Sequence, residues 1–151
     1  MKEFELIQQI QQAVGRTVEP GAGVKLGIGD DAAVLAVPDG QHLVAATDTL
    51  NAGTHFPADT SPGDIAHKCL AVNLSDLAAM GATPKWALLS LSLPQGDPEW
   101  LQSFIRGFQS LAQQHGVTLA GGDTTSGPLS VCVTALGLIE QGRQLQRDGA
   151  R

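Results

Sequence analysis

Residues 61–93 read SPGDIAHKCLAVNLSDLAAMGATPKWALLSLSL, and this stretch predicts a helix that is followed directly by a strand. Ser61 is a favourable N-cap, and Pro62 suits the first helical position because the N–H that it lacks would have no partner there. The predicted helix carries one apolar stripe, made of Leu70, Leu74 and Leu77. Gly81 is typical of the position just after a helix. In residues 86–93 leucines alternate with serines, as in a half-buried strand.

The rest of the chain adds a second long helix and further strands. Asp97 and Pro98 are predicted to begin a helix that ends at Gly116. The remaining predicted elements are a short helix at 3–14, loops at 16–25 and 51–61, and strands at 117–120 and 129–139. Helices and strands in this order predict an α+β fold, with helices on one face of a mixed sheet of four or more strands.

Residues 34–47 predict a β-hairpin. Two short apolar runs flank Pro38-Asp39-Gly40, which is a turn sequence because proline presets the first turn dihedral and glycine accepts a positive φ. Asp31 and Asp48 stand just outside the two runs. We therefore expect both carboxylates at the open end of the hairpin, close together.

Length and composition exclude several classes of protein. A chain of 151 residues forms one domain with a sizeable core. Its net charge of -6 argues against nucleic acid or an anionic membrane as a partner, and no apolar run approaches the ~18 residues that span a membrane. Cys69 and Cys132 lie in apolar runs without CxxC spacing, which predicts buried free thiols and a cytoplasmic location.

Five aspartates lie beside glycine, hydroxyl or amide residues. They occur in Gly27-Ile-Gly-Asp-Asp31, Thr47-Asp48-Thr49, Asn73-Leu-Ser-Asp76 and Gly121-Gly-Asp-Thr-Thr125. Two carboxylates about 4 Å apart repel by ~4 kcal/mol at an effective dielectric near 20, so a cluster requires protons or hard cations. Oxygen ligands without histidine or thiolate favour Mg²⁺, and glycine N–H groups can cradle phosphate oxygens. The pattern therefore predicts Mg²⁺-nucleotide chemistry.

Each segment also has a plainer interpretation. Residues 27–32 match a dinucleotide fingerprint only superficially, because an apolar strand and a turn follow instead of a helix, and a glycine turn with solvated carboxylates stays open. Asp76 lies near the negative end of its helix dipole, where a cation would stabilise it, but a solvated surface aspartate is the alternative. His55 has no second histidine at ligand spacing, so zinc is a poor candidate.

Taken together, these segments resemble thiamine-monophosphate kinase, within the wider superfamily of ATP enzymes similar to aminoimidazole ribonucleotide synthetase. Two longer motifs carry the resemblance with them, namely residues 47–56, TDTLNAGTHF, and residues 68–82, KCLAVNLSDLAAMGA. The resemblance implies transfer of the ATP γ-phosphate to thiamine monophosphate, directly and in line, to give thiamine diphosphate.

The same resemblance assigns roles to individual residues. It implies Mg²⁺ ligands at Asp31, Thr47, Asp48, Asp76 and Asp123. It implies ATP contacts at Gly122, Asp123 and Arg147, and a substrate contact at His55. The share of Asp30 in metal binding is left open. No protein nucleophile is implied, because a loose phosphoryl-transfer transition state needs positioning and charge neutralisation.

Enzymes of this family are about twice as long as this chain. The resemblance therefore implies that residues 1–151 form an amino-terminal ATP- and Mg²⁺-binding domain, that a carboxy-terminal domain is absent from the chain, and that the sheet pairs across a homodimer to form a barrel. Two alternatives remain. One is another ATP-dependent synthetase of the same superfamily, and the other is a non-catalytic, dimerising module that binds metal or nucleotide.

Overall fold

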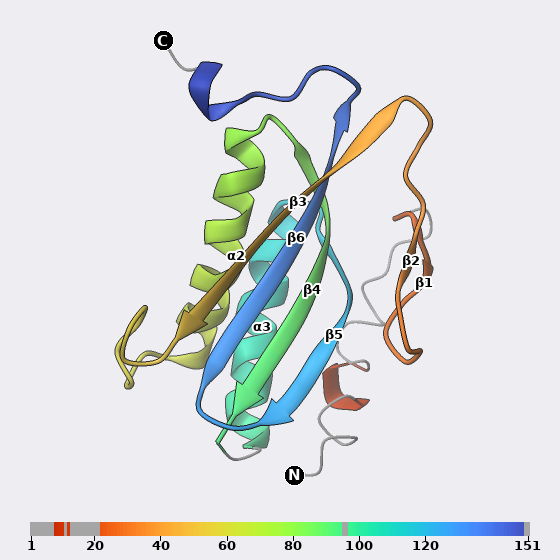
Figure 1. Cartoon of the computed structure of the whole chain (residues 1–151). Coiled ribbons are helices and arrows are strands. Elements are labelled where there is room, and N and C mark those ends of the chain that lie inside the picture. The colour runs from red at the N-terminus through yellow and green to blue at the C-terminus, as the bar shows by residue number, and fades with distance from the viewer. Residues whose placement is uncertain (1–7, 11, 13–21, 95–96, 150–151) are drawn as a thin grey trace.

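A four-stranded mixed sheet with two helices on one face forms the centre of the molecule (Figure 1). The computed structural model describes residues 8–10, 12, 22–94 and 97–149. The strands, in sheet order, are β3 (Gln41–Asn51), β6 (Ser130–Glu140), β4 (Thr83–Leu93) and β5 (Thr118–Ser126). β6 is antiparallel to both neighbours, whereas β4 and β5 are parallel. The predicted α+β fold is confirmed.

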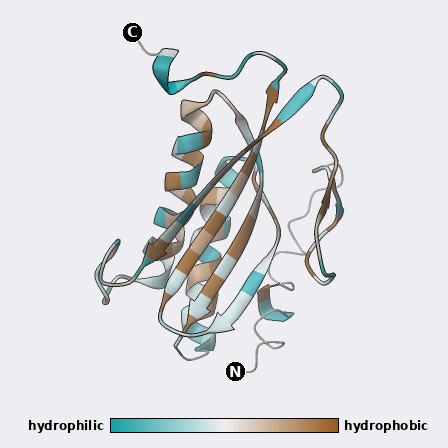
Figure 2. Ribbon diagram, viewed as in Figure 1, coloured by the Kyte–Doolittle hydropathy of each residue, from teal (hydrophilic) through white to brown (hydrophobic). Residues whose placement is uncertain are grey.

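Helices α2 (Pro62–Ala79) and α3 (Pro98–Gln114) lie behind the sheet in Figure 1 and bury its main core. Both begin as predicted, because the side chains of Ser61 and Asp97 accept hydrogen bonds from backbone N–H groups of the first turn. Figure 2 shows hydrophobic and paler residues alternating along β4 and β6, and Leu89, Leu91 and Leu93 are the buried members on β4. No helix within the described ranges is long and apolar enough to span a membrane.

A pair of glycines lets α2 and α3 approach closely. A Cβ placed on Gly107 of α3 would lie 2.5 Å from the carbonyl oxygen of Gly63 on α2. Real side chains cannot occupy that space, so the tight helix crossing requires glycine at position 107 despite its low helix propensity.

The predicted hairpin is wrong. Residues 34–35 form β2, which pairs with β1 (Val24–Leu26), whereas β3 pairs along its whole length with β6. The turn itself does form, since the Gln41 N–H donates to the Pro38 carbonyl at 3.2 Å. It joins two different sheets, because β3 gains an eleven-residue ladder with β6 that the two-residue β2 cannot offer.

Three other predicted boundaries differ from the structure. Part of the expected loop at 16–25 is strand β1, and the predicted helix at 3–14 falls mostly outside the described residues, with 8–10 and 12 helical. The strand predicted at 117–120 continues to Ser126. Gly121, Gly122 and Asp123 therefore lie inside the strand and not beyond its end.

The β1–β2 segment covers part of the sheet face that lies opposite the helices. Trp86 is 1% exposed, and its indole N–H donates to the Ala22 carbonyl at 2.8 Å. Around it pack Val24, Leu35, Leu136 and Leu138, which join the segment to β6. Farther along this face, Thr47, Ser90 and Asp123 are exposed.

Both cysteines are free thiols, as predicted; Cys69 is fully buried, whereas Cys132, which was predicted to be buried, is only partly buried. Burial raises the pKa of the Cys69 thiol from its ordinary value of 9.0 to about 12. The folded chain thus holds this proton more tightly than the unfolded chain. The contribution of the protonated thiol to stability is present below pH 9 and is lost as the pH rises toward 12.

We therefore expect the free energy of unfolding to fall more steeply between pH 9 and pH 12 in the wild type than in Cys69→Ala. Urea unfolding at several pH values measures this slope, and Cys132→Ala is the matched control. Parallel curves for the wild type and Cys69→Ala would contradict the buried-thiol explanation.

Candidate functional site

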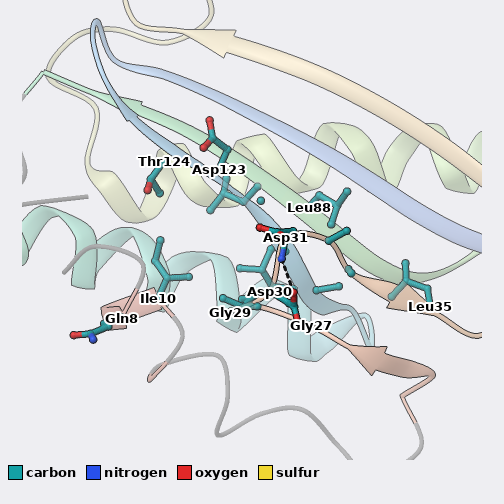
Figure 3. Close-up of a pocket in the computed structure, with 18 residues that line it drawn as sticks. Gln8, Ile10, Gly27, Gly29, Asp30, Asp31, Leu35, Leu88, Asp123 and Thr124 are labelled. Carbon is teal, nitrogen blue, oxygen red and sulfur yellow. Dashed lines mark hydrogen bonds between the residues drawn. The ribbon is translucent and has the colours of Figure 1, made fainter. Parts of the chain in front are cut away.

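A pocket of about 900 Å³ lies between the loop at 27–33 and strand β5 (Figure 3). Asp30 and Asp31 come from the loop, and Asp123 comes from β5. The Asp30 carboxylate accepts the Asp31 backbone N–H at 2.9 Å, which holds the loop in a tight turn. Among the described residues that line the pocket there is no lysine or arginine. Carboxylate oxygens without a cationic partner are the kind of ligand that a hard divalent cation prefers.

Gly122 of β5 allows this strand to approach the backbone of β4 closely. Gly122 has φ +153°, and a Cβ at this position would lie 1.8 Å from the carbonyl oxygen of Leu89 on β4. A glycine is therefore required for β5 to approach β4. Asp123 follows directly and is paired with Ser90, so the position of its carboxylate depends on this close contact.

The carboxylates that line the pocket do not all point the same way. In Figure 3 the side chain of Asp123 points away from Asp30 and Asp31, while Thr124 points to the side of β5 where Ile10 lies. This alternation follows from the strand, in which successive side chains project to opposite faces. A ligand in contact with all three aspartates would have to extend across the edge of β5.

The other predicted metal ligands lie elsewhere. Thr47 on β3 hydrogen-bonds through its hydroxyl to the Thr134 hydroxyl at 3.0 Å and donates to the Val133 carbonyl at 3.2 Å. Asp48 is half-buried and paired with Val133, whose side chain belongs to the core under the helices. Asp76 is exposed in the last turn of α2, as predicted.

The sheet separates these residues into two groups. β3 and β5 are its opposite edges, and three strand spacings of 4.7–4.9 Å place them about 14 Å apart. The expectation that Asp31 and Asp48 meet at the end of a hairpin is therefore wrong. Over residues 22–94 and 97–149, and the few described before them, no three His, Cys, Asp or Glu side chains are grouped to hold a metal ion. The five-ligand set stays a prediction.

His55 lies in a closed loop between β3 and α2. Its Nδ1 accepts the Asn51 backbone N–H at 3.0 Å, and Lys68 of α2 donates through Nζ to the His55 carbonyl. The sequence did not reveal the second contact, although Lys68 opens the motif at 68–82. The loop lies at the β3 side of the sheet, whereas the pocket lies at the β5 side (Figure 1).

Arg147 is exposed on the short 3₁₀ helix η1 (Arg147–Gly149). The preceding segment is tied to the end of α2, since the Leu145 N–H donates to the Met80 carbonyl at 3.0 Å. Figure 1 shows η1 beside the carboxyl end of α2 and on the opposite side of the molecule from β1 and β2. Arg147 is therefore not brought to the pocket in this chain, and its predicted ATP contact stays a prediction.

Comparison with known proteins now gives the family. Residues 29–139 match the model of AIR synthase related protein, N-terminal domain. The chain belongs to this family. The matched residues include the pocket loop from Gly29 onward, both helices and all four strands of the central sheet.

Two similar proteins are thiamine-monophosphate kinases. The protein of Escherichia coli K12 is 52% identical over 128 residues, which are 85% of this chain and 39% of that protein. The protein of Haemophilus influenzae is 44% identical over 151 residues, which are 100% of this chain and 45% of that protein. The chain thus spans less than half the length of these relatives.

Solved structures of thiamine-monophosphate kinases are also similar to this chain. Thiamine-monophosphate kinase from Stenotrophomonas maltophilia superposes with a TM-score of 0.82 at 50% identity, over 97% of this chain and 45% of that one. AaThiL complexed with AMPPCP and TMP has a TM-score of 0.70 at 32% identity, over 99% of this chain and 45% of that one. Hydrogenase maturation protein HypE in complex with ATP, at 23% identity and a TM-score of 0.76, shows the shared fold alone.

Proposed function

We propose that this chain is the nucleotide- and Mg²⁺-binding, amino-terminal domain of a thiamine-monophosphate kinase, which transfers the γ-phosphate of ATP to thiamine monophosphate. The pocket between the loop at 27–33 and β5, with its three carboxylates, is the observation that carries the proposal. The relatives at 44% and 52% identity are thiamine-monophosphate kinases, and a similar structure was solved with AMPPCP and TMP. The location proposed for the enzyme is the cytoplasm.

The proposed metal ligands are Asp31, Thr47, Asp48, Asp76 and Asp123, and Asp30 is their neighbour. Bound Mg²⁺ would neutralise phosphate charge as the γ-phosphate moves. Gly122 would bring the β5 backbone close to the nucleotide, and Asp123 and Arg147 would contact it. His55 would contact the substrate. The transfer is direct and in line, because a loose transition state needs no protein nucleophile.

We further propose that the complete site forms between two copies of the chain. Asp30, Asp31 and Asp123 lie at the β5 edge, whereas Thr47, Asp48 and the His55 loop lie at the β3 edge, about 14 Å away by strand spacing. In a two-fold symmetric dimer, the β3 edge of one copy can face the β5 edge of its partner twice. Such pairing of open sheet edges would produce a barrel.

Isothermal titration tests the binding function. The chain should bind AMPPCP only when Mg²⁺ is present, because the described lining of the pocket offers phosphate three carboxylates and no lysine or arginine. Thiamine monophosphate should bind to the complex with Mg²⁺ and AMPPCP. Nucleotide binding that is equally strong in excess EDTA would refute the proposed metal role.

A mixed-dimer experiment tests the shared site. Asp123→Asn and His55→Ala each damage a different edge, so each variant alone should transfer little phosphate. Co-expressed chains should regain up to about a quarter of wild-type activity, since half of the dimers are mixed and each mixed dimer has one intact site of two. No recovery, despite mixed dimers detected by mass spectrometry, would mean that each site lies within one chain.

A further inference from the structure

The loop at 51–56 is a rigid, internally hydrogen-bonded turn. The Asn51 carbonyl accepts the N–H groups of Thr54 at 3.2 Å and His55 at 2.9 Å, and the Gly53 N–H donates to the Phe56 carbonyl at 2.8 Å. Gly53 has φ +77°, a conformation that favours glycine. Phe56 is 5% exposed and anchors the end of the loop in the main core. The loop therefore presents its exposed side chains in a fixed arrangement.

The hydrogen bond to Asn51 determines which nitrogen of His55 carries the proton. A backbone N–H can only donate, and it lies 3.0 Å from Nδ1. Nδ1 must therefore be the unprotonated nitrogen, and the neutral ring carries its proton on Nε2. Within the described part of the chain, Nε2 makes no hydrogen bond. His55 thus offers a neutral N–H donor to the outside and no lone pair that could act as a general base.

Lys68 holds the loop from the other side. Its ammonium group donates to the His55 carbonyl across thirteen residues of sequence. The neighbours of Lys68 on α2, Cys69 and Leu70, are fully buried, so the base of this lysine is fixed by the core. An ammonium has three N–H donors, and one contact to a carbonyl leaves the others for an anion.

We propose that Lys68 is a positioning residue, which clamps the His55 backbone so that Nε2–H is held as a neutral donor toward the phosphate monoester of the substrate. Two types of donor then lie at this loop, namely the imidazole N–H of His55 and the remaining N–H groups of the Lys68 ammonium, which contacts the His55 carbonyl. A monoester phosphate has oxygen acceptors for both. The identity of the ligand rests on the proposed function, whereas the tautomer and the clamp rest on the contacts of this loop.

Long-range ¹H–¹⁵N spectra of the histidine rings test the clamp without any ligand, and His55→Gln identifies the signals of His55. The wild-type chain should show an unprotonated Nδ1 and a protonated Nε2. Lys68→Met keeps the length of the side chain without the donor. It releases the His55 backbone, so the hydrogen bond from the Asn51 N–H to Nδ1 should weaken and the spectrum should show an average of both tautomers. Lys68→Arg can still donate to the carbonyl and should keep the wild-type spectrum. Lys85→Met, at an exposed position on β4, is the control.

Titration with thiamine monophosphate, in the presence of Mg²⁺ and AMPPCP, tests the link to the substrate. Lys68→Met should weaken thiamine monophosphate binding about tenfold and leave the binding of AMPPCP itself unchanged. A wild-type ring protonated on Nδ1, or a Lys68→Met chain with unchanged spectrum and unchanged binding, would overturn the inference. If the spectra agree with the clamp but the wild type binds no thiamine monophosphate, the positioning role of Lys68 is supported and the proposed substrate is refuted.

Discussion

Gly122→Ala is expected to lose cooperative folding or to be destabilised by more than about 4 kcal/mol, which is at the extreme of single substitutions. The added Cβ would lie 1.8 Å from the oxygen, 2.7 Å from the carbon and 2.9 Å from the nitrogen of Leu89. These are backbone atoms of β4, at a point where β4 is hydrogen-bonded on both sides, so neither strand can move away cheaply. The backbone at φ +153° also disfavours any residue with a side chain.

Urea unfolding followed by circular dichroism measures this effect, and Gly121→Ala is the adjacent control. A Cβ on Gly121 would meet only side-chain atoms, the Leu88 Cδ2 at 3.3 Å and the Ala33 Cβ at 3.8 Å. The control should therefore change stability by less than about 1.5 kcal/mol. Equal stability of Gly122→Ala and Gly121→Ala would show that the close approach of β5 to β4 is not required.

Asp123→Asn is expected to remove the stabilisation of the chain by Mg²⁺ and AMPPCP. The substitution keeps the shape of the side chain and removes one of the three carboxylates that line the pocket. Since the residue is exposed, the fold itself should be unaffected. In the wild type, a ligand at about 100 times its Kd raises the free energy of unfolding by about 2.7 kcal/mol, and the variant should show little of this increase.

Thermal unfolding with and without the ligand pair measures this difference. Asp39→Asn is the control, because Asp39 is an exposed aspartate in the turn before β3. It should retain the full stabilisation by Mg²⁺ and AMPPCP. An Asp123→Asn chain that gains as much stability as the wild type would exclude Asp123 from the metal site.

Local chemistry in the sequence was sufficient for the helices and most strands. Ser61, Asp97, Gly81 and Gly116 mark the ends of α2 and α3 where the structure has them. These residues act through their own neighbours in the chain, so their effect does not depend on the rest of the fold. Residues 34–47 show the opposite case. The partner of β3 is β6, which is remote in sequence, and a favourable turn at Pro38 gives no information about that partner.

The candidate site was predictable in composition but not in arrangement. The aspartate segments indicated a metal and phosphate site, and the pocket does contain Asp30, Asp31 and Asp123. Sequence spacing could not reveal that β3 and β5 are opposite edges of one sheet. The strand predicted at 117–120 stops before Gly121, because the need for Gly122 arises from the backbone of a neighbouring strand and not from its own segment.

The central claim is that this domain takes part in phosphoryl transfer from ATP to thiamine monophosphate. The most direct measurement incubates the chain with γ-³²P-labelled ATP, Mg²⁺ and thiamine monophosphate, and follows the label in thiamine diphosphate and in protein. We expect labelled thiamine diphosphate that depends on Mg²⁺, with no label on the protein. Label on the protein, or labelled thiamine diphosphate that forms equally well in excess EDTA, would contradict the account.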